Sequence, residues 1–293
     1  MSHRTFRTTP ECGASVAGRG RERDLMIQNV VLRRLFAAAL TVGVCSIGSA
    51  FAQQLVYAKD GSGVYGYKDT PRLPWCEWLC HDPDRPAPAR VNPGDAAASG
   101  PIPSDAVVLF DGKDVAKWQA AADWKLEDGH LVAGNSPFTT KDSFGAVQLH
   151  LEFMTPAGFD APLFNRGNNG VFLMGLYEIQ IFESFREKIY PDGQCAAIYG
   201  QTPPLVNASR PPGEWQSFDI VFLPPTFEGD APAVPARVTV IHNGVLVHLS
   251  AEIHGETGHR IVPQYKRKAS AGPLMLGGHG CPVRFRNIWL RRL

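Results

Sequence analysis

The pattern of apolar and polar residues predicts many short β-strands and no long helix. From 148 to 153 polar residues alternate strictly with leucine or phenylalanine, which is typical of a strand with one buried face. The alternation recurs from 177 to 182, where Glu178 and Gln180 share the polar face. No long segment repeats its apolar residues with the period of about 3.6 that marks an amphipathic helix.

Turn residues separate these apolar segments. The dipeptides Asp128-Gly129 and Asn243-Gly244 lie between strand-like runs and predict tight hairpins. Glycine and proline together supply 29 and 24 of the 293 residues, which disfavours a helical bundle. Expected strands span 107–110, 124–127, 130–132, 148–153, 170–174, 177–182, 215–222, 237–241, 245–247, 274–276 and 283–290. This arrangement predicts an all-β fold, an antiparallel β-sandwich.

Residues 1–52 have the layout of a secretory signal peptide. Arg33-Arg34 precede an uncharged apolar run from 35 to 47, and Ala50-Phe51-Ala52 forms a small-x-small cleavage site. Met26 would open a leader of ordinary length, so the residues before it are interpreted as upstream sequence. The apolar run is too short for a comfortable membrane span, so we expect no stable membrane anchor. The mature protein is therefore expected in the periplasm or outside the cell.

Two regions follow the leader. Residues 53–104 are rich in proline, glycine, aspartate and alanine, which predicts an extended N-terminal arm. Its aromatic residues suggest that it packs onto the following domain: Tyr65, Tyr67, Trp75 and Trp78. Residues 105–293 carry the strand pattern and form the predicted sandwich domain.

The net charge of +1 comes from the leader. Residues 1–52 hold seven arginines and three acidic residues, which leaves 22 basic and 25 acidic residues in the rest. A mildly acidic mature chain argues against a dedicated nucleic-acid binder. The oligomeric state is left open.

Four cysteines remain after the predicted cleavage, and four cysteines allow three pairings. Cys76 and Cys80 are close in sequence, whereas Cys195 and Cys281 lie in the domain body. We therefore expect disulfides Cys76–Cys80 and Cys195–Cys281 in an oxidising compartment. Only His81 could join the first pair as a further ligand, so no metal site is predicted there. No cofactor is expected, and no loop is acidic enough to predict a structural Ca²⁺ ion.

The sandwich region carries a series of motifs in a fixed order. They include Leu109-Phe110-Asp111-Gly112, Gly167-Asn168-Asn169-Gly170, Tyr177-Glu178-Ile179-Gln180, Ala197-Ile198-Tyr199-Gly200, Pro211-Pro212-Gly213-Glu214-Trp215, His242-Asn243-Gly244 and Arg284-Phe285-Arg286-Asn287. In order and spacing, residues 105–293 resemble the 3-keto-disaccharide hydrolase domain family. The resemblance implies a concanavalin A-like, laminin-G-like jelly-roll sandwich, which agrees with the strand pattern.

The resemblance also implies a reaction, the cleavage of glycosides whose glucose unit carries a ketone at C3. Such a ketone acidifies the neighbouring C2–H, so a base can remove that proton and the C1 substituent can leave by elimination. Water then adds back, which gives net hydrolysis. This route needs one general base, a helper for the ketone oxygen and polar groups that bind the sugar. Ordinary glycoside hydrolysis instead needs two opposed carboxylates.

Three residues are candidates for proton transfer. Glu152 and Glu178 lie on the polar faces of two strands, and either could be the base if those strands share a groove. His279 lies in the glycine-rich turn 277–280, where it could act as the acid or help the ketone. The alternative is that each glutamate is solvated or ion-paired and that His279 only caps a turn.

Six further residues are candidates for binding a small carbohydrate substrate. Their side chains offer hydrogen bonds, a positive charge or an aromatic surface for the sugar: Lys141, His150, Asn169, Gln180, Trp215 and Arg286. For most of them the alternative is an ordinary surface or packing role.

Two other functions remain open. A non-catalytic, lectin-like carbohydrate-binding module would show aromatic residues on a flat face without converging proton-transfer groups. A glucanase-like hydrolase would cleave unoxidised disaccharides. A pocket that gathers a carboxylate and a histidine would favour the 3-keto-glycoside enzyme.

Overall fold

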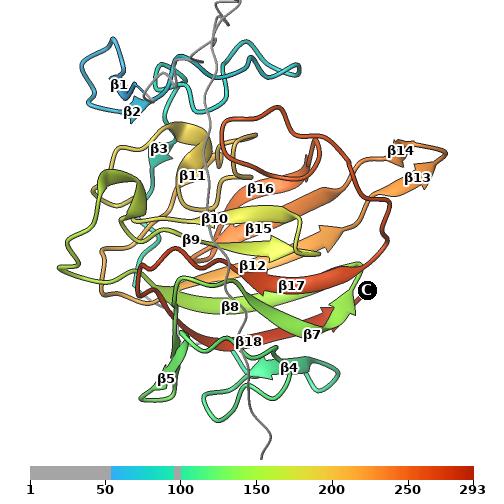
Figure 1. The fold of residues 1–293 in the computed structure, drawn as a ribbon. Coiled ribbons are helices and arrows are strands. Elements are labelled where there is room, and N and C mark those ends of the chain that lie inside the picture. The colour runs from blue at the N-terminus through green and yellow to red at the C-terminus, as the bar shows by residue number, and fades with distance from the viewer. Residues whose placement is uncertain (1–53, 96–99) are drawn as a thin grey trace, which may run out of the picture. The chain divides into compact units, whose positions relative to one another are not determined.

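The computed structural model describes residues 54–95 and 100–293, so the predicted leader lies outside the described residues. The described part is almost entirely β-structure with two short 3₁₀ helices (Figure 1). The strands are β1 (Val56–Tyr57), β2 (Tyr65–Gly66), β3 (Ala89–Arg90), β4 (Val107–Phe110), β5 (Lys125–Glu127), β6 (His130–Val132), β7 (Phe138–Phe144), β8 (Val147–Met154), β9 (Asn169–Leu173), β10 (Tyr177–Ile181), β11 (Val206–Asn207), β12 (Gln216–Leu223), β13 (Thr226–Glu228), β14 (Ala231–Val234), β15 (Arg237–His242), β16 (Val245–Glu252), β17 (Gly272–Leu276) and β18 (Arg284–Arg292). The 3₁₀ helices are η1 (Leu163–Asn165) and η2 (Pro191–Gly193).

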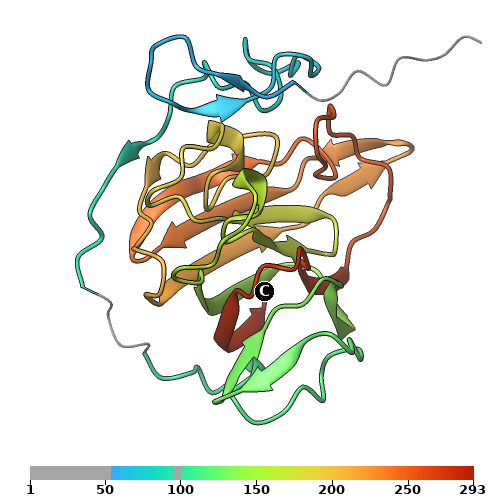
Figure 2. The same cartoon turned by 60° about the vertical axis from the view of Figure 1, so that its left-hand side comes forward.

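Two antiparallel sheets form the predicted β-sandwich. The large sheet has the order β16-β15-β12-β8-β18-β6-β5, with β4 paired to β18, and the small sheet has the order β10-β9-β17-β7. Strands β12, β15 and β16 lie side by side in both views (Figures 1 and 2). The all-β fold class predicted from the alternation is confirmed. In the described ranges, no helix has the length and apolarity needed to cross a bilayer.

The core lies between the two sheets. On β8, Leu149 and Leu151 are completely buried, and they belong to the same apolar cluster as Ile179 of β10. The rings of Tyr177 on β10 and Phe222 on β12 lie 5.8 Å apart between centroids, which joins the sheets directly. Because side chains alternate along a strand, the polar residues of β8 and β10 must point away from this core. The two sheets therefore carry polar surfaces on opposite sides of the sandwich.

The two predicted hairpins are present. Asn243 and Gly244 both have positive φ, 52° and 80°, and connect β15 to β16. Asp128 and Gly129 have φ of 51° and 75° and connect β5 to β6. Positive φ at both central residues is the geometry that favours Asn-Gly and Asp-Gly in two-residue turns.

The N-terminal arm is fastened to the sandwich domain by aromatic packing. Tyr65 and Tyr67 form a small buried cluster with Phe182, Ile189 and Tyr190. Farther along the arm, β3 pairs in parallel with β11. The expectation that aromatic residues of the arm pack onto the domain is confirmed for Tyr65 and Tyr67.

The predicted disulfides Cys76–Cys80 and Cys195–Cys281 are wrong, because all four cysteines are free. The thiol of Cys80 faces the carbonyl oxygen of Gly200 at 3.5 Å and is not bonded to Cys76. Cys195 and Cys281 are packed into the apolar core as small hydrophobic residues. Burial raises the pKa of the Cys195 thiol to about 12 and that of Cys281 to about 11, so both stay protonated.

We expect four titratable thiols in a chain that begins at Gln53 and is purified without reductant. The count is made with a chromogenic disulfide reagent in denaturant, before and after reduction. In native buffer, the buried and protonated thiols should react slowly. A count that rises on reduction would show that a disulfide had formed.

Candidate functional site

The predicted site residues are divided between the two outer faces of the sandwich. Glu178 and Gln180 project from β10 of the small sheet, whereas His150 and Glu152 project from β8 of the large sheet. The condition that the strands of Glu152 and Glu178 share a groove is therefore not met. Both strands alternate as predicted, but they belong to different sheets and turn their polar faces in opposite directions.

A cavity of about 510 Å³ covers the outer face of the small sheet. Such a volume lies within the range of small-molecule sites. The apolar part of its wall includes Tyr67, Phe164, Phe172 and Tyr190. Its polar groups are Asn168, Glu178, Gln180, Tyr199, Thr257, His259 and His279. Glu178, Gln180 and His279 are thus brought together as the sequence analysis expected.

Glu178 is a buried acid at the floor of this cavity. Only 6% of the residue is exposed, and desolvation raises the pKa of its carboxyl group to about 8. Gln180 supports it, because in the orientation that gives both amide groups partners its nitrogen donates to Glu178 Oε1 at 3.0 Å. A carboxyl group with this pKa exchanges its proton close to neutral pH.

Gly170 makes the space that the Glu178 side chain occupies. A Cβ atom at position 170 would lie 2.2 Å from Glu178 Oε1 and 2.8 Å from its Cγ and Cδ atoms. The neighbouring Gly277 donates its backbone N–H to the carbonyl oxygen of Gly170 at 2.9 Å. These two glycines leave the cavity floor open between the carboxyl group and the turn that carries His279.

His279 stands at the rim of the cavity. Its carbonyl oxygen accepts a hydrogen bond from Asn165 Nδ2 at 2.9 Å, which holds the turn in place. The residue keeps contact with solvent, yet partial desolvation lowers the pKa of its imidazole. At neutral pH the ring is therefore neutral and can donate or accept a hydrogen bond.

A chain of hydrogen bonds crosses the opposite wall. The hydroxyl of Tyr199 lies 3.1 Å from that of Tyr190 and 2.9 Å from His259 Nδ1. Desolvation lowers the pKa of His259 to about 4, so its ring is neutral, and its Nδ1 shares a hydrogen bond with the Tyr199 hydroxyl. Tyr199 is also fixed through its backbone, since its N–H donates to the carbonyl oxygen of Glu178 at 3.1 Å.

Sequence reasoning missed several of these residues. Tyr199 lay within a recognised motif but was assigned no role, and Tyr67 was noted only as an aromatic residue of the arm. No pattern in the sequence singles out His259, because it lies in a loop without alternation. Its position could be found only from the fold.

Two other predicted residues lie outside the cavity. Asn169 is completely buried, and its Oδ1 accepts from the backbone N–H of Gly170 at 2.8 Å. Lys141 lies on β7, and its ammonium group donates to the carbonyl oxygen of Ala116 at 2.7 Å. The expected role of these two residues in sugar binding has no support in their positions.

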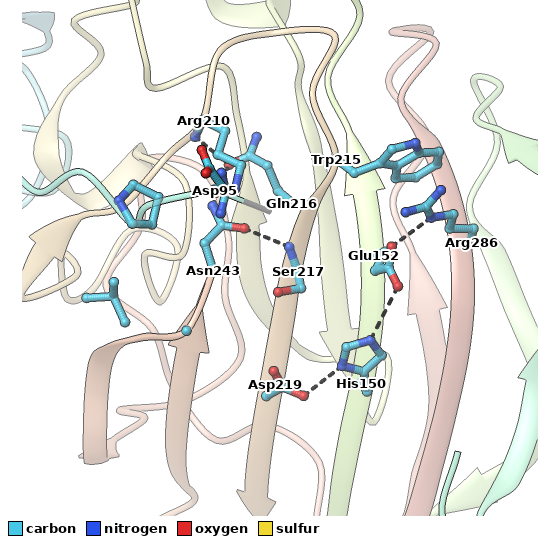
Figure 3. Close-up of a pocket in the computed structure, with 13 residues that line it drawn as sticks. Asp95, His150, Glu152, Arg210, Trp215, Gln216, Ser217, Asp219, Asn243 and Arg286 are labelled. Atoms are coloured by element: carbon cyan, nitrogen blue, oxygen red, sulfur yellow. Dashed lines mark hydrogen bonds and ion pairs between the residues drawn. The ribbon is translucent and has the colours of Figure 1, made fainter. Parts of the chain in front are cut away.

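The remaining predicted residues line a second pocket of about 400 Å³ on the large sheet (Figure 3). Arg286 Nε donates to Glu152 Oε2 at 2.7 Å, and its guanidinium lies 4.0 Å from the centroid of the Trp215 ring. His150 Nδ1 lies 2.7 Å from Asp219 Oδ1. Burial disfavours the charged imidazole, but the carboxylates of Asp219 and Glu152 outweigh it and raise the pKa of His150 to about 9.

Glu152 is therefore a member of an ion-pair network. Asn287 Nδ2 also donates to its Oε1 at 2.9 Å, so both oxygens have partners. Both oxygens of Glu152 are thereby engaged, and the residue lies on the other side of the sandwich from Glu178 and His279. The ion-paired alternative for Glu152 is the one that the structure supports.

Comparison with known proteins places the chain in a family. Residues 105–291 match the 3-keto-alpha-glucoside-1,2-lyase-like domain. The chain belongs to this family. A solved structure of a candidate glycosyl hydrolase from Parabacteroides distasonis ATCC 8503 is 36% identical, with a TM-score of 0.62 over 68% of this chain and 95% of that one. A second from the same organism is 24% identical, with a TM-score of 0.48 over 64% of this chain and 99% of that one.

None of the curated proteins matches the chain. Five polar residues of the cavity lie within the matched residues 105–291: Glu178, Gln180, Tyr199, His259 and His279. Tyr67 is different, because the arm precedes the first matched residue. The family match and the similar glycosyl hydrolase together point to an enzyme that acts on carbohydrates.

We expect Glu178→Gln to raise the melting temperature more at pH 8.5 than at pH 5. The pKa of Glu178 is raised to about 8 in the folded state, from an ordinary value of 4.5. Between these values the unfolded chain ionises first, so the wild type loses stability as pH rises. Glutamine does not ionise and removes that loss.

Thermal unfolding at several pH values measures this effect. Glu228→Gln, at an exposed position on the β13–β14 hairpin, is the matched control and should follow the wild-type curve. Parallel curves for wild type and Glu178→Gln would mean that the pKa of Glu178 is not raised.

Proposed function

We propose that the cavity around Glu178 cleaves 3-keto-glycosides by removing the proton from C2 of the oxidised sugar. The observation that carries the proposal is the presence of one carboxyl group. Among the described residues that line this cavity, Glu178 is the only acid. Ordinary glycoside hydrolysis uses two carboxylates on either side of the bond, whereas elimination beside a ketone needs one base.

In this mechanism, ionised Glu178 takes the C2 proton, and the electrons of that bond form an enolate with the C3 ketone. Neutral His279 at the rim donates a hydrogen bond to the developing oxyanion. The enolate then collapses, a C1=C2 double bond forms, and the C1 oxygen leaves with its substituent. The leaving oxygen takes a proton from the Tyr199 hydroxyl of the same cavity, and the proton that Glu178 removed from C2 replaces it, so the enzyme returns to its starting state.

The first product is an unsaturated 3-keto sugar. If water adds across its double bond, with oxygen at C1 and a proton at C2, the net reaction is hydrolysis. If the unsaturated sugar is released, the enzyme is a lyase. Both outcomes use the same base and differ only in whether water reaches the bound product.

The raised pKa of Glu178 suits this reaction. Proton abstraction is most effective when the pKa of the base lies near the working pH and not far below it. A carboxyl group of ordinary pKa would be fully ionised but too weak a base for a carbon acid. The dry cavity floor supplies the higher basicity, and about half the groups are ionised near pH 8.

The leader predicted at residues 1–52 places this activity in the periplasm or outside the cell as part of the same proposal. Glycosides met there would be small carbohydrates, consistent with the size of the cavity.

The proposal is tested with 3-keto-trehalose beside unoxidised trehalose. We expect turnover of the oxidised sugar alone, with a rate that rises with pH up to about 8 as Glu178 ionises. Glu178→Gln should lower kcat by roughly 10²- to 10⁴-fold, the usual contribution of a general base. Glu152→Gln is the matched control and should keep most of the activity.

Products are followed by NMR in heavy water, which separates the unsaturated sugar from the hydrated one. Equal cleavage of trehalose and its 3-keto derivative would support the glucanase-like alternative. Binding of either sugar without cleavage would support the lectin-like alternative.

A second variant tests the packing of the base. Gly170→Ala puts a methyl group on the space held by the Glu178 carboxyl, so the side chain must move. A displacement of about 1 Å from productive geometry costs roughly 10²-fold in rate. We expect kcat for 3-keto-trehalose to fall by about that factor, while the protein still folds.

Gly100→Ala is the control for Gly170→Ala, since no atom of the described residues lies within 4 Å of a Cβ at position 100. Steady-state rates and melting temperatures are compared for both variants. Full activity of Gly170→Ala would show that Glu178 does not need its present position.

A further inference from the structure

The N-terminal arm reaches the cavity that holds Glu178. Tyr67 of the arm lines this cavity, although the family domain begins only at residue 105. The Tyr67 ring is held by an aromatic and a cationic partner. It stacks on Phe164 with centroids 5.4 Å apart and planes at 16°, and the guanidinium of Arg260 lies 4.7 Å from its centroid.

The Tyr67 hydroxyl is left available. Within residues 54–95 and 100–293 it has no hydrogen-bond partner, and it is not among the fully buried unpaired polar atoms. Only 4% of the residue as a whole is exposed. The Tyr67 ring is therefore fixed in the cavity wall, and its hydroxyl keeps some exposure without a hydrogen-bond partner in the described residues.

His81 ties the arm to the two loops that form the rest of this wall. Its backbone N–H donates to Asp192 Oδ2 at 3.0 Å, and its Nδ1 lies 3.4 Å from Asp192 Oδ1. Its Nε2 accepts the backbone N–H of Arg260 at 3.2 Å. The ring also stacks on Tyr190 and on His259, with centroids 4.1 Å and 5.0 Å apart.

These contacts place His81 directly behind the catalytic wall. Asp192 follows Tyr190 by two positions, and Arg260 follows His259. One arm residue thus fixes both ends of the Tyr190–Tyr199–His259 hydrogen-bond chain. Arg260 also forms an ion pair with Asp69 of the arm, in which Nη2 and Oδ2 lie 2.6 Å apart.

Cys80, His81 and Asp192 lie close enough together to invite comparison with a metal site. However, both imidazole nitrogens already face protein partners. Burial also raises the pKa of the Cys80 thiol, which opposes the thiolate that a metal would need. The contacts of His81 are better explained as hydrogen bonds that attach the arm to the domain than as a metal site.

We propose that the arm forms the part of the site that holds the leaving group, with Tyr67 as the residue that contacts it and His81 as a positioning residue. This inference rests on the proposed function of the Glu178 cavity. Glu178 and Gln180 fix the oxidised ring at the sheet, and a cavity of about 510 Å³ leaves room for a second ring beside it. The remaining wall is the aromatic one to which the arm contributes.

The test compares two substrates that differ in the leaving group alone. Tyr67→Phe keeps the ring and removes the hydroxyl. It should raise KM for 3-keto-trehalose roughly three- to tenfold, the value of one hydrogen bond, with kcat changed less than twofold. KM for methyl 3-keto-α-glucoside, which has no second ring, should stay the same. Tyr57→Phe, at a position of the same arm that is 58% exposed, is the control.

His81→Asn tests whether His81 holds the arm and the two loops in position. Asparagine tolerates the positive φ of 62° at this position, but it lacks the stacking ring and cannot reach both loops. It should reproduce the KM effect on 3-keto-trehalose and increase hydrogen exchange in 190–201 and 255–261. A merely structural loss would lower the apparent kcat for both substrates equally.

Equal KM changes for both substrates, or none, would overturn the inference while leaving the proposed function intact. If no 3-keto sugar is turned over, the proposed function fails, and the Kd values of trehalose and methyl α-glucoside decide the inference. Selective loss of trehalose affinity in Tyr67→Phe would then support it. Equal affinities, or no binding of either sugar to the wild type, would overturn it.

Discussion

The period-two alternation of the strands is the constraint on which the rest of this structure depends. Each long strand must turn its apolar side chains into one shared core, because no other element could cover them. The polar side chains of the two sheets are thereby forced to opposite sides of the molecule. Pockets are then found on these outer polar faces, over β10 of the small sheet and around Glu152 of the large sheet.

The same amino acid takes on two different properties in these surroundings. Glu152 has Arg286 and Asn287 as partners, so its negative charge is stabilised where it is. The Glu178 carboxyl group has the neutral amide of Gln180 as its partner, and burial penalises its ionised form. The first arrangement joins neighbouring strands of the large sheet, whereas the second keeps a proton available near neutral pH. Burial makes the ionised form of Glu178 less stable, and the same effect makes its carboxylate a stronger base.

Much of the fold and part of the site could be predicted from the sequence. Alternation and the Asn243-Gly244 and Asp128-Gly129 turns are local signals, and the strands and hairpins formed where they indicated. Glu178 and Gln180 were found from the alternation of their strand, and His279 from its glycine-rich turn. The sheet to which each strand belongs is a long-range property, so the separation of Glu152 from Glu178 was not predictable.

The errors at the cysteines and the missed loop residues have the same origin. Cysteine count and proximity suggested disulfides, but burial in the core satisfied Cys195 and Cys281 without a partner. His259 and His81 acquire their roles through contacts between segments that no local pattern connects. The roles of such residues can be recognised only once the three-dimensional positions of the loops are known.

The hydrogen bonds of His81 join the arm to residues that lie much later in the chain. Asp192 lies 111 positions later in the chain, and Arg260 lies 179 positions later. Closing loops of this length is entropically costly, and contacts so distant in sequence form late in folding. The arm is the first described segment to be synthesised, yet His81 meets both of its partners only once the chain extends to residue 260. A chain that stops short of residue 260 would therefore lack this wall.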